Sequence, residues 1–226
     1  MKMHMSHEGP HIDGIPLGES PTNRRRLAPE SIRVIEMMRK YQQAIREQER
    51  LRYLAYHDSL TGLPNARAFT ETFESSADTA IMNKERLGLA LIDIVGLKFA
   101  NDTYGHAKGN ELIKSVADVL RSQSRTKDEA FRIGGDEFAI ILPSYEAQTL
   151  KGQHRETLDA QLSKRYVERA QDSVKRLGLP LTHVGLNIAV SAMRADESPK
   201  EFFIRVDDIL IGNKPKKDDS RLRPID

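Results

Sequence analysis

The sequence predicts an α/β domain of the α+β kind, in which helices pack on a central sheet. Amphipathic helical segments and strand-like apolar runs alternate along residues 57–214, and one tight hairpin links two of the runs. No internal repeat is visible. Alternation of this sort indicates a sheet covered by helices. The 226 residues are enough for one such domain and an extension.

The expected elements follow in order along the chain. Residues 87–97, LGLALIDIVGL, form a near-continuous apolar run, as a central strand covered on both faces does. The segment 109–123 places Leu112, Val116 and Leu120 on one face of a helix. The other expected elements are a turn and helix starting at 57, a hairpin over 130–142, a helix over 155–179, a strand over 183–193 and a helix over 199–214.

The segments outside this domain differ from it in composition. Residues 1–28 are rich in Pro, Gly, His and charge without periodicity, which predicts a flexible leader, and residues 215–226 form a polar tail. Residues 29–56 have no internal Gly or Pro and predict a helical stalk. Its seam follows the 4-3-4 spacing of a coiled coil, through Val34, Met38, Tyr41 and Ile45. We expect it to pair with the same helix of a second chain; packing against its own domain is the alternative.

Composition excludes several classes of protein. The net charge of +2 argues against a nucleic acid polymer as partner. The absence of Cys excludes disulfides, thiol nucleophiles and thiolate metal sites. No apolar run approaches the roughly 18 residues of a membrane span, and the N-terminus lacks an apolar signal-peptide core. We therefore expect a cytoplasmic protein without a membrane span.

The stretch AFRIGGDEFAIILP, residues 130–143, places two glycines and two acids between apolar runs. One interpretation is structural: Gly134 and Gly135 form a two-residue hairpin turn, because glycine adopts positive φ without steric cost, and the acids keep the tip hydrated. The other is that the glycines let a phosphate approach the backbone while an adjacent acid binds a metal. The hairpin alone leaves both open.

Asp93 ends the apolar run 87–97, where a charge is costly without a partner. One interpretation is purely structural: the Asp93 carboxylate caps the next turn. If its strand lies beside the hairpin, Asp93 and Asp136 converge at one end of the sheet. Two hard oxygen ligands there would suit Mg²⁺, with nucleotide phosphates completing the shell. Such a site can align a hydroxyl for phosphoryl transfer.

Three blocks of the sequence resemble the motif blocks of GGDEF domains, the diguanylate cyclases, in order and interval: HDSLTGLPNARAF, LIDIVGLKFANDTYGHAKGNEL and RIGGDEFAIILP. The resemblance covers roughly residues 52–214. It implies a central mixed sheet flanked by helices, related to nucleotidyl-cyclase and polymerase palm domains. It also implies that two facing protomers each present one GTP and join the pair into the bacterial second messenger cyclic di-GMP.

The resemblance implies a metal site for Mg²⁺ (or Mn²⁺). Its ligands would be the carboxylates of Asp93 and Asp136 and the carbonyl of Ile94. Glu137, next to the second ligand, would support it, and Lys98 would face the phosphates as a catalytic residue.

Substrate and product contacts also follow from the resemblance. Phosphate would lie against Gly134 and Gly135 and against the turn at Gly96, Leu97 and Lys98, with Lys214 as a further phosphate-facing lysine. Asn101 matches a residue that hydrogen-bonds guanine, and Asn110 stands where the family usually has a guanine-reading Asp. In RTKD, residues 125–128, Arg125 and Asp128 match the inhibitory site that binds the product.

The sequence departs from the family pattern at several positions, and these departures affect the residues that would set base specificity and turnover while leaving the metal ligands intact. Val95 replaces an Asp two residues after the first metal ligand. Loss of an Arg after Lys214 removes one phosphate contact, for which Lys216 or Lys217 could substitute. The other departures are Ala66 in place of an Arg, Asn110, Asn187 and Ala189 in NIAV for Ser-Ile-Gly-Val, and Lys217 and Asp218 for Gly and Arg.

The sequence thus favours a diguanylate cyclase that is inhibited by its product and is preceded by a dimerising or signal-receiving stalk. The main alternative is a catalytically weak GGDEF module, acting as a cyclic di-GMP receptor through Arg125 and Asp128 or as a scaffold through 29–56. A third hypothesis, an unrelated Mg²⁺-dependent nucleotidyl transferase, conflicts with the specific set of motifs.

Overall fold

The computed structural model describes residues 29–145 and 157–213. The chain has two compact units, one ending at Glu49 and the other beginning at Arg50. The expected leader, the polar tail and Lys214 lie outside the described residues, as do Lys216, Lys217 and Asp218.

Helix α1 (Pro29–Tyr56) spans the residues for which the sequence predicted a helix. The predicted coiled-coil seam is exposed in the single chain: Val34, Met38, Tyr41 and Ile45 are 46%, 60%, 69% and 38% accessible. An apolar stripe of this kind on an otherwise polar helix is typical of a surface that another helix covers.

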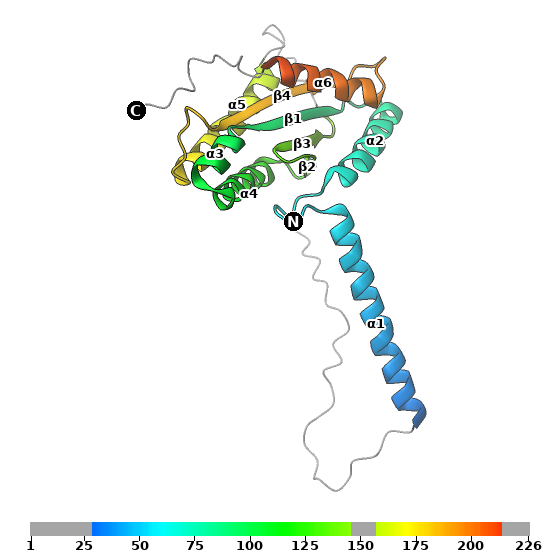
Figure 1. Ribbon diagram of the computed structural model, residues 1–226. Helices are drawn as coiled ribbons and strands as arrows, with labels where there is room; N and C mark the ends of the chain where they lie inside the picture. Colours follow the sequence, from blue (N-terminus) through cyan, green and yellow to red (C-terminus); the bar gives the residue numbers. More distant parts are fainter. Residues whose placement is uncertain (1–28, 146–156, 214–226) are drawn as a thin grey trace, which may run out of the picture. The chain divides into compact units, whose positions relative to one another are not determined.

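The second unit is built on a four-stranded sheet in the order β2-β3-β1-β4 (Figure 1). Its strands are β1 (Gly88–Val95), β2 (Glu129–Arg132), β3 (Glu137–Leu142) and β4 (Gly185–Ala192). The α+β class with a sheet flanked by helices is confirmed. Each described pair of neighbouring strands is antiparallel, whereas the sequence suggested a mixed sheet. Strands β1 and β2 run in the same direction, but β3 lies between them. Strands β3 and β4 also run in the same direction, but β1 lies between them, so no two parallel strands are neighbours.

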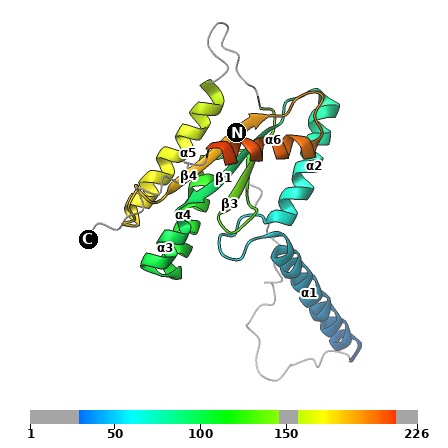
Figure 2. The ribbon, with the colours of Figure 1, turned by 45° about the horizontal axis from the view of Figure 1, so that its top comes forward.

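Strand β1 is buried on both faces, as its apolar run predicted. Alternate side chains enter two separate cores, because successive residues of a strand point to opposite faces. Ala90, Ile92 and Ile94 belong to the core beneath helices α4 and α5. Leu89 and Leu91 belong to the core beneath helices α2 and α6. Figure 2 shows the two helical layers on either side of the sheet.

The helices of this unit are α2 (Ala66–Asn83), α3 (Leu97–Tyr104), α4 (His106–Gln123), α5 (Thr157–Arg176) and α6 (Pro199–Asn213). Helix α4 begins three residues before the predicted 109, and α3 was not predicted as a helix. The two are separated by Gly105, whose φ of 85° only glycine adopts readily. Ala189, which departs from the family pattern, is buried in the core under α2 and α6.

Candidate active site

Asp93 lies next to the acids of the hairpin, at one end of the sheet. In the β1–β3 ladder it stands directly opposite Glu137, and the next residue, Ile94, donates its N–H to the Asp136 carbonyl at 3.0 Å. On the other side of β1, Asp93 stands opposite Asn187 of β4. Asp93 is 8% exposed, while Asp136 is half-buried and Glu137 exposed. The structure therefore brings Asp93 and Ile94 of β1 together with Asp136, the last residue before β3.

The glycines of the hairpin do not form the two-residue turn that the sequence suggested. Residues 133–136 all lie between the strands, and the N–H groups of Ile133 and Gly134 both donate to the Glu137 carbonyl, at 3.0 and 3.2 Å. Neither Gly134 nor Gly135 adopts a left-handed φ, because the wider loop does not require one. A Cβ on Gly134 would overlap the Glu137 carboxylate, whereas one on Gly135 would meet nothing within 4 Å. Gly135 thus leaves open space beside Asp136.

The start of α3 supplies backbone N–H groups close to the end of β1. Ala100 makes the first bond of the helix, donating to the Gly96 carbonyl at 3.0 Å. The N–H groups of Leu97, Lys98 and Phe99 precede that bond and have no acceptor within the helix. Gly96, with φ of 80°, packs so closely on the His183 carbonyl that any side chain would overlap it. A helix start of this form, with the exposed Lys98, can bind an anion.

Asn101 and Asn110 lie on the two helices that meet at Gly105. Asn101 is half-buried in α3, and its side-chain oxygen lies against Gly109, where a Cβ would overlap it. Asn110 follows in α4 and is exposed. Asn110 does not cap the start of a helix, because α4 begins at His106 and its N-cap is Gly105. The side chain is therefore free of a capping role.

Arg125 and Asp128 form the turn between α4 and β2. The Asp128 carboxylate accepts a hydrogen bond from the Arg125 backbone N–H at 2.9 Å, and the Asp128 N–H donates to the Arg125 carbonyl at 3.0 Å. Among the described residues no salt bridge joins their side chains. Arg125 is exposed. The two residues are thus held together through the backbone of Arg125, and the Arg125 guanidinium lies at the surface.

The residues at the sheet end fit a magnesium ion that takes part of its shell from a substrate. Within the described ranges, no group of three or more His, Asp or Glu side chains gathers to hold a metal. Two carboxylates and a carbonyl do not fill the coordination shell of the ion. Mg²⁺ commonly uses one or two protein carboxylates together with substrate phosphates, so this donor set matches that mode.

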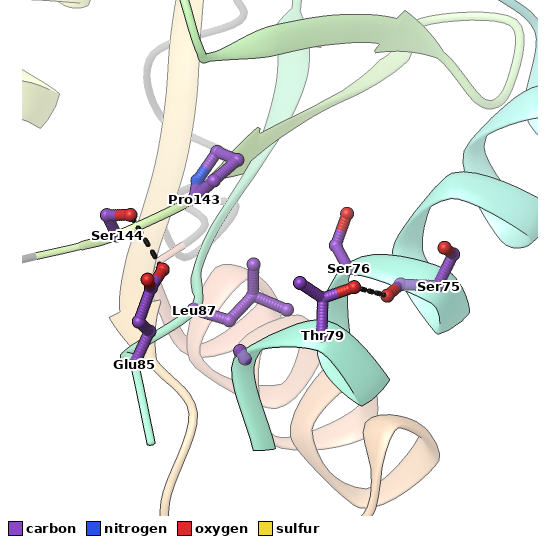
Figure 3. Close-up of a pocket in the computed structure, with 8 residues that line it drawn as sticks. Ser75, Ser76, Thr79, Glu85, Leu87, Pro143 and Ser144 are labelled. Carbon is purple, nitrogen blue, oxygen red and sulfur yellow. Dashed lines mark hydrogen bonds between the residues drawn. The ribbon is translucent and has the colours of Figure 1, made fainter. Parts of the chain in front are cut away.

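A hollow lies at the opposite end of the sheet, where β1 begins and β3 ends (Figure 3). Its volume is about 130 Å³, and its lining includes Ser76, Leu87 and Pro143. Ser144 donates to the Glu85 carboxylate at 2.9 Å across one side. Leu87 immediately precedes β1 and lies six residues before Asp93, roughly 20 Å along an extended chain. The hollow is therefore separate from the acids described above.

Comparison with known proteins identifies the family. The family described as "Diguanylate cyclase, GGDEF domain" matches residues 55–220. The chain belongs to the GGDEF family. Over 166 residues it is 36% identical to diguanylate cyclase DgcM of Escherichia coli K12, a match that covers 73% of this chain and 37% of that protein. Over 88 residues it is 38% identical to diguanylate cyclase DgcS of Shewanella oneidensis, covering 39% and 30%. The chain thus spans well under half the length of these relatives.

Solved structures agree with the GGDEF fold. The coiled coil and GGDEF domain of DgcB from Caulobacter crescentus, in complex with c-di-GMP, gives a TM-score of 0.68 at 22% identity and covers 83% of this chain and 95% of that one. Diguanylate cyclase SiaD of Pseudomonas aeruginosa, in complex with its activator SiaC, gives 0.58 at 27% identity and covers 82% and 68%. No described helix of this chain is long and apolar enough to cross a membrane.

Two residues that brace the GGDEF hairpin were not singled out from the sequence. The Arg132 guanidinium donates to both carboxylate oxygens of Asp58, at 2.9 and 3.0 Å, and to the Gly135 carbonyl at 2.8 Å. Asp58 in turn accepts from the backbone and hydroxyl of Thr61, at 2.8 and 2.6 Å. Both partners sit inside the quoted motif blocks, but 74 residues separate them, so no local pattern indicated the pair.

The environment of Asp58 favours its charged form. Burial acts to raise the pKa of Asp58, but hydrogen bonds from Thr61 and Arg132 outweigh it and hold the pKa below its ordinary value. The side chains of Arg132 and Asp58 are only 12% and 21% exposed. An ion pair with this little exposure is screened less by solvent and salt than a surface pair.

Replacing Asp58 should lower the stability of the domain at neutral pH. Because the folded-state pKa lies below the ordinary 3.8, the carboxylate stabilises the fold above that value and loses its contribution as pH falls through the folded pKa. We expect Asp58→Asn to cost on the order of 1–3 kcal/mol at neutral pH, with a flatter stability profile in acid. Urea unfolding across acidic and neutral pH measures both effects.

The control for Asp58→Asn is Glu168→Gln, which removes an exposed ion pair with Lys164 at 3.8 Å. Such surface pairs contribute about 0–1 kcal/mol, so this variant should unfold like the wild type. Equal stability of Asp58→Asn and Glu168→Gln would show that the brace contributes nothing to the fold.

Proposed function

We propose that this chain is a diguanylate cyclase that joins two GTP molecules into cyclic di-GMP, using Mg²⁺ or Mn²⁺ and two facing protomers. The observation that carries the proposal is the position of the buried Asp93 beside the acids of the hairpin. The next residue is Ile94, whose carbonyl would be the third metal ligand, and α3 begins just after the end of this strand. Family membership and the activity named for the relatives support it.

Each group of the site has a part in this reaction. The cation, when bound, neutralises phosphate charge and helps align the attacking hydroxyl. Asp93, Asp136 and the Ile94 carbonyl hold it, and Glu137 supports that set. The N–H groups at the start of α3, with Lys98 and Lys214, hold the phosphates, and Gly134 and Gly135 let them approach. Asn101 and Asn110 contact the base.

Removing one metal-binding charge should abolish most of the activity. Asp93→Asn and Asp136→Asn keep the side-chain shape but lose an anionic ligand. Since a catalytic cation is worth several kcal/mol in charge stabilisation, we expect formation of cyclic di-GMP to fall about 100-fold or more with the fold intact. Mass identification of the product after incubation with GTP and Mg²⁺ measures this.

The matched control for these variants is Asp118→Asn, at an exposed position of α4 that is paired only with Arg121 at the surface. It should cyclise GTP like the wild type. Near-normal product formation by Asp93→Asn or Asp136→Asn would refute the assignment of the metal ligands.

Dimerisation through α1 is part of the proposal, because each site presents one GTP and two must meet. The exposed stripe of Val34, Met38, Tyr41 and Ile45 supplies the apolar seam. We expect Met38→Lys with Tyr41→Lys to weaken self-association and to lower activity per chain at low protein concentration. Sedimentation and a concentration series measure both.

The control for the seam is Gln43→Lys, which adds charge to α1 outside the 4-3-4 positions. It should associate and cyclise like the wild type. If the seam variant sediments like the wild type, α1 does not join the protomers.

Asn110 should weaken the preference for guanine. A carboxylate accepts hydrogen bonds only and can take both N1–H and N2–H of guanine, whereas an amide offers one acceptor and one donor group, a pattern that suits adenine. An unpaired buried polar group costs on the order of 1–3 kcal/mol, about 10- to 150-fold in affinity. Asn101 keeps a separate guanine contact, so we expect Asn110→Asp to raise the GTP/ATP preference within that range.

Competition between GTP and ATP in the wild type and in Asn110→Asp measures this preference. An unchanged ratio and unchanged GTP affinity would show that Asn110 does not contact the base.

A second candidate function is that of a cyclic di-GMP receptor. In this case the chain would be a catalytically weak GGDEF module that is regulated by cyclic di-GMP bound at Arg125 and Asp128. The exposed Arg125 guanidinium on a turn closed by Asp128 favours a binding role for this pair. Guanidinium groups make paired hydrogen bonds to phosphate or a guanine edge. Product formed from GTP and Mg²⁺ supports the enzyme; cyclic di-GMP binding by calorimetry without product supports the receptor.

A further inference from the structure

Helix α3, which supplies the open backbone N–H groups beside β1, is too short to be stable by itself. It has eight residues, and helices shorter than about 12–15 residues are marginal in water without tertiary contacts. Ala100 is its buried residue, while Leu97 and Phe99 are partly buried against the core beneath α4 and α5. The first turn of α3 therefore depends on what packs against these three residues.

The Phe99 ring is covered by an aromatic ring from a distant segment. The imidazole of His183 stacks on it, with 4.5 Å between the ring centroids and an angle of 16° between the ring planes. Tyr104, the last residue of α3, meets the Phe99 ring edge-on at 6.1 Å. His183 and Phe99 are both half-buried. Aromatic pairs in such geometries contribute free energy beyond the apolar area that they bury.

His183 is itself held in the loop that precedes β4. Its N–H and the N–H of Val184 both donate to the Pro180 carbonyl, each at 3.1 Å. The Thr182 hydroxyl lies 2.8 Å from Nδ1 of the imidazole, within hydrogen-bond distance. Val184 is buried, and β4 begins at the next residue. The His183 ring is therefore attached to a backbone that is fixed on both sides.

The same residue contacts the turn that joins β1 to α3. The His183 carbonyl packs on Gly96, where a Cβ would overlap it. Gly96 in turn accepts the first hydrogen bond of α3, from the Ala100 N–H at 3.0 Å. His183 thus touches the chain on both sides of Leu97 and Lys98: its backbone meets the residue before them, and its ring meets the residue after them.

We propose that His183 is a positioning residue for the nucleotide: by holding Gly96 and Phe99, it fixes the first turn of α3, so that the open N–H groups are in place before the phosphates bind. This rests on the proposed function, which assigns these N–H groups to the phosphates. Donors that are already ordered lose less conformational freedom on binding than donors on a frayed helix. The side chains of His183 and Phe99 have no substrate contact in the proposed reaction, so they act through the turn.

The test is a double-mutant cycle on binding of a non-hydrolysable GTP analogue with Mg²⁺, measured by calorimetry. His183→Ala and Phe99→Leu each remove the stack, and Phe99→Leu keeps an apolar side chain against the core. We expect each to weaken binding about 2- to 10-fold, which corresponds to the loss of one aromatic pair. Because both variants remove the same contact, the double variant should bind like either single variant. Effects that multiply would overturn the proposal.

A conservative variant separates the stack from a general loss of stability. His183→Phe should bind the analogue like the wild type, because a phenyl ring can stack on Phe99 although it cannot bond to Thr182. If His183→Phe binds as weakly as His183→Ala, the stack is not what positions the turn. If His183→Ala does not fold, Phe99→Leu and His183→Phe still give the comparison with and without a stacked pair of rings.

The matched control is Leu181→Ala, which shortens an exposed side chain of the same loop. It should leave analogue binding unchanged. Hydrogen exchange at the Ala100 amide should accelerate in His183→Ala and not in Leu181→Ala, because that amide makes the first bond of α3. Unchanged exchange at Ala100 in His183→Ala would show that the stack does not hold the turn.

Inorganic triphosphate with Mg²⁺, used as a competitor of the analogue, shows which part of the nucleotide is affected. His183→Ala should weaken the binding of triphosphate by the same factor as the binding of the analogue, since the open N–H groups are assigned to the phosphates. A weaker analogue with an unchanged triphosphate would mean that His183 acts on the base, and the proposal would be wrong.

The outcome separates this inference from the proposed function. If the wild type binds the analogue but makes no cyclic di-GMP, the proposed activity fails and the cycle still reports on His183. If product forms and the two variants act independently, only the positioning role fails. If the analogue does not bind at all, both proposals are wrong.

Discussion

The antiparallel pairing of β1 with both β3 and β4 is the constraint on which the site depends. It pairs both edges of β1 and sets Glu137, Asp93 and Asn187 side by side across three strands. Because side chains alternate along a strand, a slip of one residue would move Asp93 to the opposite face and would exchange the residues of β1 that enter the two cores. The apolar residues on either side of Asp93 therefore fix where that carboxylate lies.

Gly96 belongs to the site because its neighbours leave no room for a side chain. Gly96 packs on the His183 carbonyl and also has positive φ, so there are two separate reasons why the turn from β1 into α3 needs glycine at this position. Gly134 packs on the Glu137 carboxylate. These contacts bring the start of α3 and the hairpin loop next to the end of β1. Because the Glu137 carboxylate is the end of an exposed, flexible side chain, the contact at Gly134 can adjust, and positive φ is not involved there.

Much of the fold could be predicted because it follows from local periodicity. The apolar run 87–97, the amphipathic face of Leu112, Val116 and Leu120, and the long helix at 29–56 all correspond to observed elements. Helix α3 was missed because it has only eight residues, carries polar motif residues and lies between two glycines of positive φ. The loop form of the hairpin was missed because it is set by bonds to the Glu137 carbonyl, which no turn propensity encodes.

The parts of the site that could not be predicted are those that join distant segments. Arg132 and Asp58, and His183 and Phe99, meet only after the strands have paired and the helices have docked. A pattern of residue types identifies the acids and glycines, because their chemistry is visible in the sequence; it does not identify the side chains that hold them.

The paired carboxylates have an energetic consequence for the proposed function. Like charges directly opposite each other on a ladder are destabilising, and Asp93 and Glu137 occupy such positions. A cation bound between the strands would offset this cost, and since it binds the folded state only, it would raise the stability of the fold. The β1–β3 register that aligns the hydrophobic cores is therefore also the one that sets two carboxylates side by side at this end of the sheet, where the start of α3 and Lys98 contribute positive potential.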